Sequence, residues 1–142
     1  MNNSLKEQAH GEIERIFRIL LPQNGLAVRE EQITLCHAML DTLLKNNIAL
    51  CDAGVGIGKT YAYLTACILL KKFAPHGPAG SQPVVVSTSS VALQDAIIGE
   101  YIPFLSRIFW RTASFKSPSG RWCERARNAL SATSAFPGVW KR

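Results

Sequence analysis

The stretch of sequence that decides the fold is residues 48–60, which read IALCDAGVGIGKT. The first four residues are a short, continuous apolar run, which is typical of a strand buried on both faces of a sheet. Residues 53–60 then fit the Walker A pattern G-x-x-x-x-G-K-[ST], with Ala53 in place of the first glycine. When a buried strand leads into this pattern and a helix follows it, the pattern predicts a phosphate-binding loop.

The residue types of this loop suit a polyphosphate anion. Consecutive backbone N–H groups and the positive end of a helix dipole can hold such an anion, and glycines permit the close approach that a Cβ would prevent. Lys59 is predicted to reach the β- and γ-phosphates, and the Thr60 hydroxyl to ligate Mg²⁺. The alternative is a glycine-rich turn with a structural role only. The predicted nucleotide-binding residues are Ala53, Gly54, Val55, Gly56, Ile57, Gly58, Lys59 and Thr60.

Apolar periodicity and turn residues predict the elements on either side of this stretch. The expected elements are helices over residues 4–20, 29–45 and 91–101, a helix from the loop to Lys72, a loop over 74–83 and a second buried strand over 84–88. Pro103 is expected to close the last helix. Because two strands joined by a helical crossover pair in parallel, this order predicts an α/β fold with two parallel core strands.

The net charge is concentrated at one end of the chain. The chain has 142 residues, which is enough for one domain with a core and too short for two ordinary ones. Of the formal charge of +6, residues 1–108 contribute nothing, because they hold nine basic and nine acidic side chains. Residues 109–142 are expected to form an irregular basic tail, with a short helix near 123–131. Its interleaved arginines and tryptophans suggest an alternative function as a small basic nucleic-acid-binding module.

The composition excludes several classes of protein. No apolar run approaches the ~20 residues of a membrane helix. The first residues, MNNS, lack the basic and apolar regions of a signal peptide, so a cytoplasmic protein is expected. The four cysteines include no Cys-x-x-Cys pair, so neither a disulfide framework nor a complete zinc site is expected. Three cysteines lie among apolar residues and are interpreted as small buried side chains: Cys36, Cys51 and Cys67. The histidines are interpreted as structural or solvent-facing: His10, His37 and His76.

The catalytic half of a nucleotide-hydrolysing site is absent from the pattern. Hydrolysis needs an acidic residue that holds Mg²⁺, usually at the end of another buried strand. Downstream of Thr60 no apolar run ends in Asp or Glu, since Asp95 and Glu100 fall on a predicted helix and Glu124 lies among arginines. We therefore predict nucleotide binding without hydrolysis. A different P-loop enzyme, such as a small-molecule kinase, would need this acidic strand and a complete core.

Three motifs, taken in order, resemble those of superfamily 2 DNA helicases of the DinG/XPD type. Residues 29–32, REEQ, look like the adenine-recognising R-x-x-Q element of that group. Residues 51–64, CDAGVGIGKTYAYL, are similar to its motif I, including the alanine start and the Tyr-Leu continuation. Residues 84–94, VVVSTSSVALQ, resemble its motif Ia. The resemblance covers residues 26–108.

The resemblance implies a partial RecA-like P-loop NTPase domain over residues 1–108 that binds ATP with Mg²⁺. It implies that Arg29 and Gln32 recognise adenine, although Gln32 on a helix is generically a solvated polar residue. It also implies a contact between motif Ia and the backbone of single-stranded DNA. The motif Ia residues concerned, which could instead cap and flank a helix, are Ser87, Thr88 and Gln94.

The chain also departs from the family's pattern. It lacks motif II, the second domain and the arginine finger, so we expect neither ATP hydrolysis nor unwinding from this chain alone. Many members carry a four-cysteine iron–sulfur insertion after motif Ia, where only Cys123 falls here, so no cluster is expected. The resemblance thus describes the ATP-binding, N-terminal segment of an ATP-dependent DNA helicase. A separately encoded remainder of the helicase is a candidate partner.

The tail carries a different signal from the helicase-like segment. If the reading frame shifts by one base after about Ile108, codons can be chosen so that residues 109–133 read as another string. That string resembles what the family places after motif Ia, and it ends at the first cluster cysteine. We interpret residues 109–142 as out-of-frame sequence, a hypothesis that the nucleotide sequence beyond codon 108 tests.

Overall fold

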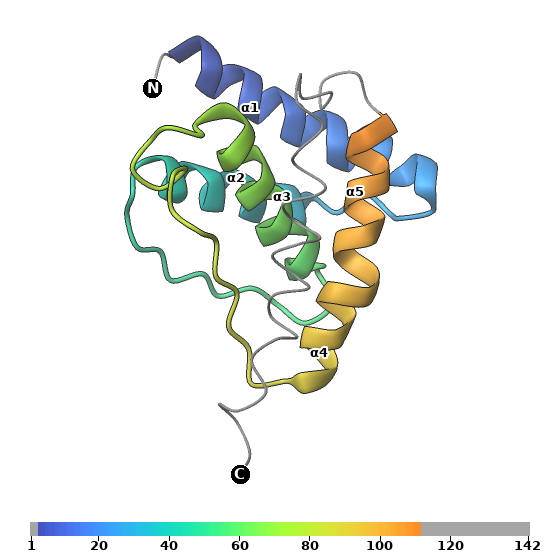
Figure 1. The fold of residues 1–142 in the computed structure, drawn as a ribbon. Helices are drawn as coiled ribbons and strands as arrows, with labels where there is room; N and C mark the ends of the chain where they lie inside the picture. The colour runs from blue at the N-terminus through green and yellow to red at the C-terminus, as the bar shows by residue number, and fades with distance from the viewer. Residues whose placement is uncertain (1–2, 112–142) are drawn as a thin grey trace. The chain divides into compact units, whose positions relative to one another are not determined.

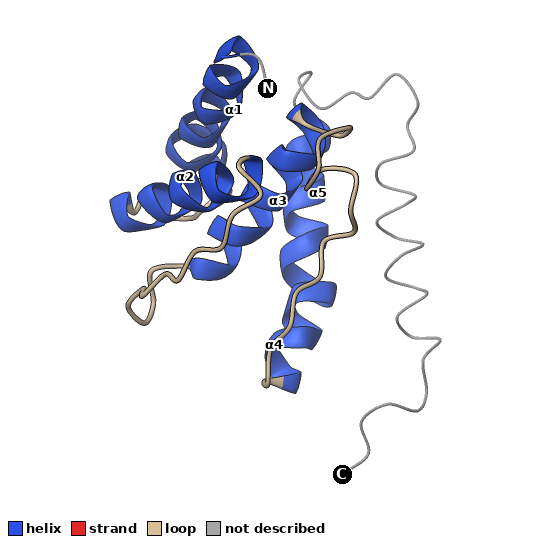
Figure 2. Ribbon diagram, turned by 90° about the vertical axis from the view of Figure 1, so that its left-hand side faces the viewer, coloured by secondary structure: helices blue, strands red, loops and turns tan. Residues whose placement is uncertain are grey.

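The computed structural model describes residues 3–111 of the chain, and every regular element within that range is a helix. Figure 2 shows helices and loops and no strand among these residues. The prediction of an α/β fold, a partial RecA-like domain with two parallel core strands, is therefore wrong. The described part of the chain is all-helical.

The two segments predicted to be buried strands are irregular and open to solvent. In the first segment, Ile48 is 95% and Leu50 98% exposed, and in the second Val85 is 83% exposed. An apolar run shows that a segment could be buried, but a strand also needs a neighbouring strand to take up its backbone hydrogen bonds. Neither segment has such a neighbour within residues 3–111. The pattern therefore predicted a burial that the described fold does not provide.

The described residues divide into two units, with the boundary between Val91 and Ala92. The helices of the first unit agree with three predicted helices, one over residues 4–20, one over residues 29–45 and one from the glycine-rich loop to Lys72. They are α1 (Asn3–Arg15), the π-helical η1 (Ile16–Leu20), the short 3-10 turn η2 (Pro22–Asn24), α2 (Glu30–Leu44) and α3 (Lys59–Phe73). Helix α2 packs against α3, and α1 packs against both (Figure 1).

The core of the first unit is built from the apolar stripes of these helices. Side chains recur at spacings of three and four, which places them on one helix face. The fully buried large side chains include, from α1 and η1, Ile13, Ile16 and Phe17, from α2, Leu40, and from α3, Leu69. This packing holds α2 and α3 side by side, and it therefore positions the glycine-rich loop that precedes α3.

Two prolines follow π-helical turns, with different results. The π turn of η1 ends at Leu20, two residues before Pro22, and the chain then reverses through Gly25, whose φ is +88°. In the second unit, η3 (Ile97–Tyr101) ends two residues before Pro103, yet the helix continues. Proline lacks an N–H and its ring clashes with the carbonyl four residues back in an α-helix. A π turn widens the helix at that point, so the ring fits.

The described part of the second unit is one continuous helix with a π turn inside it. This helix begins with α4 (Val91–Ala96), whose first residue still belongs to the first unit, and continues through η3 and α5 (Ile102–Arg111). The expectation that Pro103 closes the helix is wrong, because the Ile102 N–H donates to the Ile97 carbonyl across the π turn and α5 runs on. The predicted tail begins within α5, and residues 112–142, with the predicted short helix, lie outside the described residues.

The segment over residues 74–83 is a loop, as predicted, and it is fastened by a lysine. Lys71 Nζ donates to the carbonyl oxygens of Gly80 (2.7 Å) and Gln82. Gly80 is buried, and a Cβ added there would lie 1.6 Å from the Ala74 carbonyl oxygen. The tight approach of the two backbone segments thus requires glycine at position 80.

The cysteines do not share one environment. Cys36 is buried, and burial raises the pKa of its thiol. Cys67 is half-buried with a pKa that burial also raises, whereas Cys51 is exposed. The interpretation of Cys51 as a buried side chain is wrong, since the strand that was to bury it does not form.

In residues 3–111 we find no helix of the length and apolar character that crossing a bilayer requires.

Thr65 is fully buried in α3, and its hydroxyl has no hydrogen-bond partner within the described residues. Thr65→Val removes this unsatisfied group and keeps the shape, so we expect the free energy of unfolding to rise by about 1 kcal/mol. Urea denaturation measures it. In the control Thr42→Val the lost hydroxyl donates to the Ala38 carbonyl at the surface, and we expect a change within about 0.5 kcal/mol. A loss of stability in Thr65→Val would mean that the hydroxyl has a partner.

Candidate functional site

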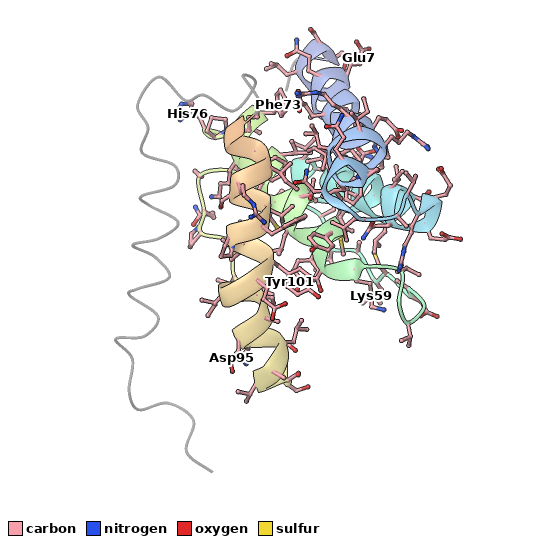
Figure 3. The ribbon with its side chains drawn as sticks, turned by 90° about the vertical axis from the view of Figure 1, so that its right-hand side faces the viewer. Glu7, Lys59, Phe73, His76, Asp95 and Tyr101 are labelled. Carbon is pink, nitrogen blue, oxygen red and sulfur yellow. The ribbon has the colours of Figure 1, made fainter. Side chains whose placement is uncertain are left out.

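The glycine-rich loop lies immediately before α3 and bends through two left-handed backbone positions. Gly56 has φ +85°, and Gly58, the N-cap residue of α3, has φ +82°. Side chains with a Cβ rarely adopt these angles, which explains two of the loop's glycines. The loop brings the backbone to the N-terminus of α3, where Lys59 begins the helix (Figure 3).

Gln32 of α2 holds the end of this loop. Its side chain is only 5% exposed, and its Nε2 donates to the Gly58 carbonyl oxygen at 2.7 Å. A Cβ added to Gly58 would lie 2.0 Å from that nitrogen. Gly58 is therefore needed for its backbone angle and for the space that Gln32 occupies. Gln32 is a positioning residue for the loop, a role that the spacing of the sequence did not reveal.

Lys59 folds back over the loop that precedes it. Its Nζ donates to the carbonyl oxygens of Ala53 (2.8 Å) and Gly54 (2.6 Å). Residues 55 and 56 form a turn, and residues 54–58 lie outside the helices. The loop thus combines an exposed ammonium group, backbone N–H groups outside the helices and a helix N-terminus, an arrangement that favours an anion.

The other predicted nucleotide-binding residues lie around this loop with different exposures. Ala53, Ile57 and Thr60 are half-buried, and Val55 is fully exposed. Arg29 precedes α2 as its N-cap residue, in an extended conformation, and its side chain is exposed. The structure therefore brings Gln32 to Gly58 and Lys59 to the start of the loop.

The residues predicted to contact DNA fall in two parts of the chain. Ser87 is exposed, and Thr88 is half-buried, with its Oγ1 accepting from the Ser90 N–H at 3.2 Å. That local contact is the helix-flanking role which the sequence left open for Thr88. Gln94 is exposed on α4 and belongs to the second unit.

The sequence prediction missed a polar network between α1 and α2. His10 and His37, which we interpreted as structural or solvent-facing, contact each other and two carboxylates, those of Asp41 and Glu14. A signal was present in the sequence, because each histidine precedes an acidic residue by four positions on its own helix. That spacing places each pair on one helix face.

Comparisons with known proteins identify relatives over about two thirds of the chain. No protein-family profile matches the chain, and no solved structure matches it significantly. A protein of Escherichia coli K12 described as ATP-dependent DNA helicase YoaA is 32% identical over 97 residues, which is 68% of this chain and 14% of that protein. A protein of Staphylococcus aureus USA300 described as 3'-5' exonuclease DinG is 27% identical over 97 residues, 68% of this chain and 10% of that protein.

The chain thus spans no more than about one seventh of the length of these two relatives. The match agrees with the resemblance recognised from the three motifs. This chain is a distant relative of the DinG/YoaA helicases and corresponds to a fragment of them.

Proposed function

We propose that residues 53–60 form a Walker A phosphate-binding loop and that this chain is the ATP-binding segment of a DinG-like DNA helicase. The observation that supports it best is the loop itself. It has left-handed glycines at 56 and 58, Lys59 folded onto the loop carbonyls, and a helix N-terminus at its end. Phosphate groups are held in such places by backbone N–H groups and by the helix dipole.

The residues present fit ATP and Mg²⁺ as the bound groups. Lys59 would exchange the Ala53 and Gly54 carbonyls for phosphate oxygens, because an ammonium group prefers an anionic acceptor. Thr60, in the first turn of α3, would supply a hydroxyl to Mg²⁺, which favours oxygen ligands. Arg29 and Gln32 would act on adenine by resemblance to the family. In this structure Gln32 also fixes the Gly58 carbonyl, so it would link the base and the phosphate loop.

Single-stranded DNA is the proposed second ligand, through Ser87, Thr88 and Gln94. This assignment rests on the resemblance to motif Ia and on the exposure of Ser87 and Gln94. Separately encoded helicase sequence is the proposed partner that would supply the acidic residue for hydrolysis. The fragment alone would therefore bind ATP without turnover.

Lys59→Met tests the nucleotide site. We expect the dissociation constant for ATP with Mg²⁺, measured by calorimetry, to rise at least tenfold, because a hydrogen bond to a charged group contributes about 1.5–3 kcal/mol. Lys45→Met is the matched control, since Lys45 is an exposed lysine that follows α2. It should leave the dissociation constant unchanged, and circular dichroism should show both variants folded.

Equal affinity in Lys59→Met and in the wild-type chain would contradict the proposal. An ATPase assay with and without single-stranded DNA completes the test. Turnover by the wild-type chain alone would instead favour an independent P-loop enzyme, because the helicase fragment lacks the acidic partner.

A further inference from the structure

His10 of α1 and His37 of α2 face each other head to head. Their Nδ1 atoms are 2.5 Å apart, and their ring planes differ by only 13°. The ring centroids are 4.8 Å apart. This is close to the sum of the Nδ1–Nδ1 distance and the distance from each ring centroid to its own Nδ1 atom, as expected when these four points lie on one line. The two rings are therefore nearly coplanar with their nitrogen atoms in line. This is the geometry of an N–H···N hydrogen bond, in which one nitrogen donates and the other accepts.

The outer nitrogen of each ring contacts a carboxylate of the opposite helix. His10 Nε2 lies 2.9 Å from Asp41 Oδ1, and His37 Nε2 lies 2.7 Å from Glu14 Oε1. An ionised carboxylate accepts only, so both Nε2 atoms must carry hydrogen. A neutral imidazole has one N–H group, and in each of the two rings that group donates to the carboxylate on the outer side. The inner hydrogen bond then needs one proton more than two neutral rings supply.

The surroundings favour a positive charge on the pair. The hydrogen bond from His37, and then that from Arg18, lower the pKa of Glu14. Burial raises the pKa of Asp41, but hydrogen bonds from Lys6 and His10 outweigh it and hold the pKa below its usual range. Both carboxylates therefore stay ionised. The charged groups on the pair are Asp41 of α2 and Glu14 of α1, which in turn contact Lys6 of α1 and Arg18 of η1.

We propose that His10 and His37 share a single proton that fastens α1 to α2, which makes the stability of this helix pair greatest at mildly acidic pH. The two facing Nδ1 atoms are placed to hold one proton between them. Within residues 3–111 no group of three or more His, Cys, Asp or Glu side chains is arranged to hold a metal ion. Two neutral rings would set two lone pairs against each other, and two charged rings would set two N–H groups against each other.

The sign of the pH dependence follows from counting protons. Above the ordinary histidine pKa of about 6.5 the unfolded chain carries no proton on these two rings and the folded pair carries one, so stability falls as pH rises. Below it the unfolded chain carries two and the folded pair one, so stability falls as pH drops. Each difference of one proton changes the unfolding equilibrium constant about tenfold per pH unit. His76 is exposed and lies in the loop over residues 74–83, outside this pair, so it is the matched control position.

Nitrogen NMR of the full chain labelled with ¹⁵N-histidine tests the proposal directly. We expect a scalar coupling between the two Nδ1 atoms across the hydrogen bond, together with protonated Nε2 atoms on both rings near pH 6.5. His76→Gln should leave these signals in place, and His37→Gln should remove the coupling. A wild-type spectrum near pH 6.5 with no coupling and two neutral rings would overturn the proposal.

Urea unfolding of the wild-type chain across pH 5–8 gives a second, independent measurement. We expect maximum stability near pH 6.5 with the tenfold-per-unit slopes on both sides, unchanged in His76→Gln. In His10→Gln and His37→Gln the maximum should flatten. Because the wild-type curve alone carries the prediction, a variant that fails to fold does not affect the test. A flat wild-type curve would overturn the proposal.

Discussion

Gly58→Ala is expected to destabilise the first unit and to disable the glycine-rich loop together. The left-handed angle of Gly58 costs a Cβ-bearing residue about 1–2 kcal/mol. The new Cβ would also lie 2.0 Å from Gln32 Nε2, so Gln32 must leave the Gly58 carbonyl, at a cost of about 1–3 kcal/mol for the buried amide. We expect urea denaturation to show a loss of about 2–5 kcal/mol. Under the proposed function, the same substitution should also lower the affinity for ATP at least tenfold.

Two further variants separate strain from the loss of the Gln32 contact. Gly56 has the same kind of angle but open space where a Cβ would lie, so Gly56→Ala should cost the strain alone. In Gln32→Ala the side chain that clashes is absent, so adding Gly58→Ala to it should cost less than in the wild-type chain. This coupling is measured by a double-mutant cycle. Additive effects, or equal losses in Gly56→Ala and Gly58→Ala, would contradict the role assigned to Gln32.

Leu40→Ala and Leu50→Ala are expected to differ by several kcal/mol, although the chemical change is the same. Leu40 is completely buried on α2, whereas Leu50 is 98% exposed. Truncating a buried leucine removes its transfer free energy and leaves a cavity, which costs about 2–5 kcal/mol. Truncating an exposed leucine should change stability by no more than about 0.5 kcal/mol. Urea denaturation of the two variants side by side measures the difference.

The same pair tests the correction to the predicted fold. A buried strand over residues 48–51 would make Leu50→Ala as costly as Leu40→Ala. Light scattering adds a second readout, because the exposed side chains of Ile48, Leu50 and Val85 expose apolar surface to other molecules. Leu50→Ala should lower the tendency to aggregate. A loss of stability above about 2 kcal/mol in Leu50→Ala would show that this segment is buried.

Local sequence patterns predicted the helices well. The spacing of Ile13, Ile16 and Phe17 places these apolar side chains on one helix face, and that face is buried once a neighbouring helix packs against it. Glycines 56 and 58 followed by Lys59 predicted a bend into a helix, since these backbone angles depend on the residues themselves. Pro103 misled the prediction, because the helix continues through it after the π turn of η3.

The sequence by itself determined the helices of the first unit, the glycine-rich loop and the relationship to DinG-like helicases, because these depend on residues close together in the chain. The tertiary structure decided what depends on distant partners. Within residues 3–111, it left residues 48–51 and 84–88 without the neighbouring strand that their hydrogen bonds require. It also placed Gln32 on the Gly58 carbonyl and His10 against His37. Such contacts form only when packed helices bring side chains from separate parts of the chain within hydrogen-bonding distance.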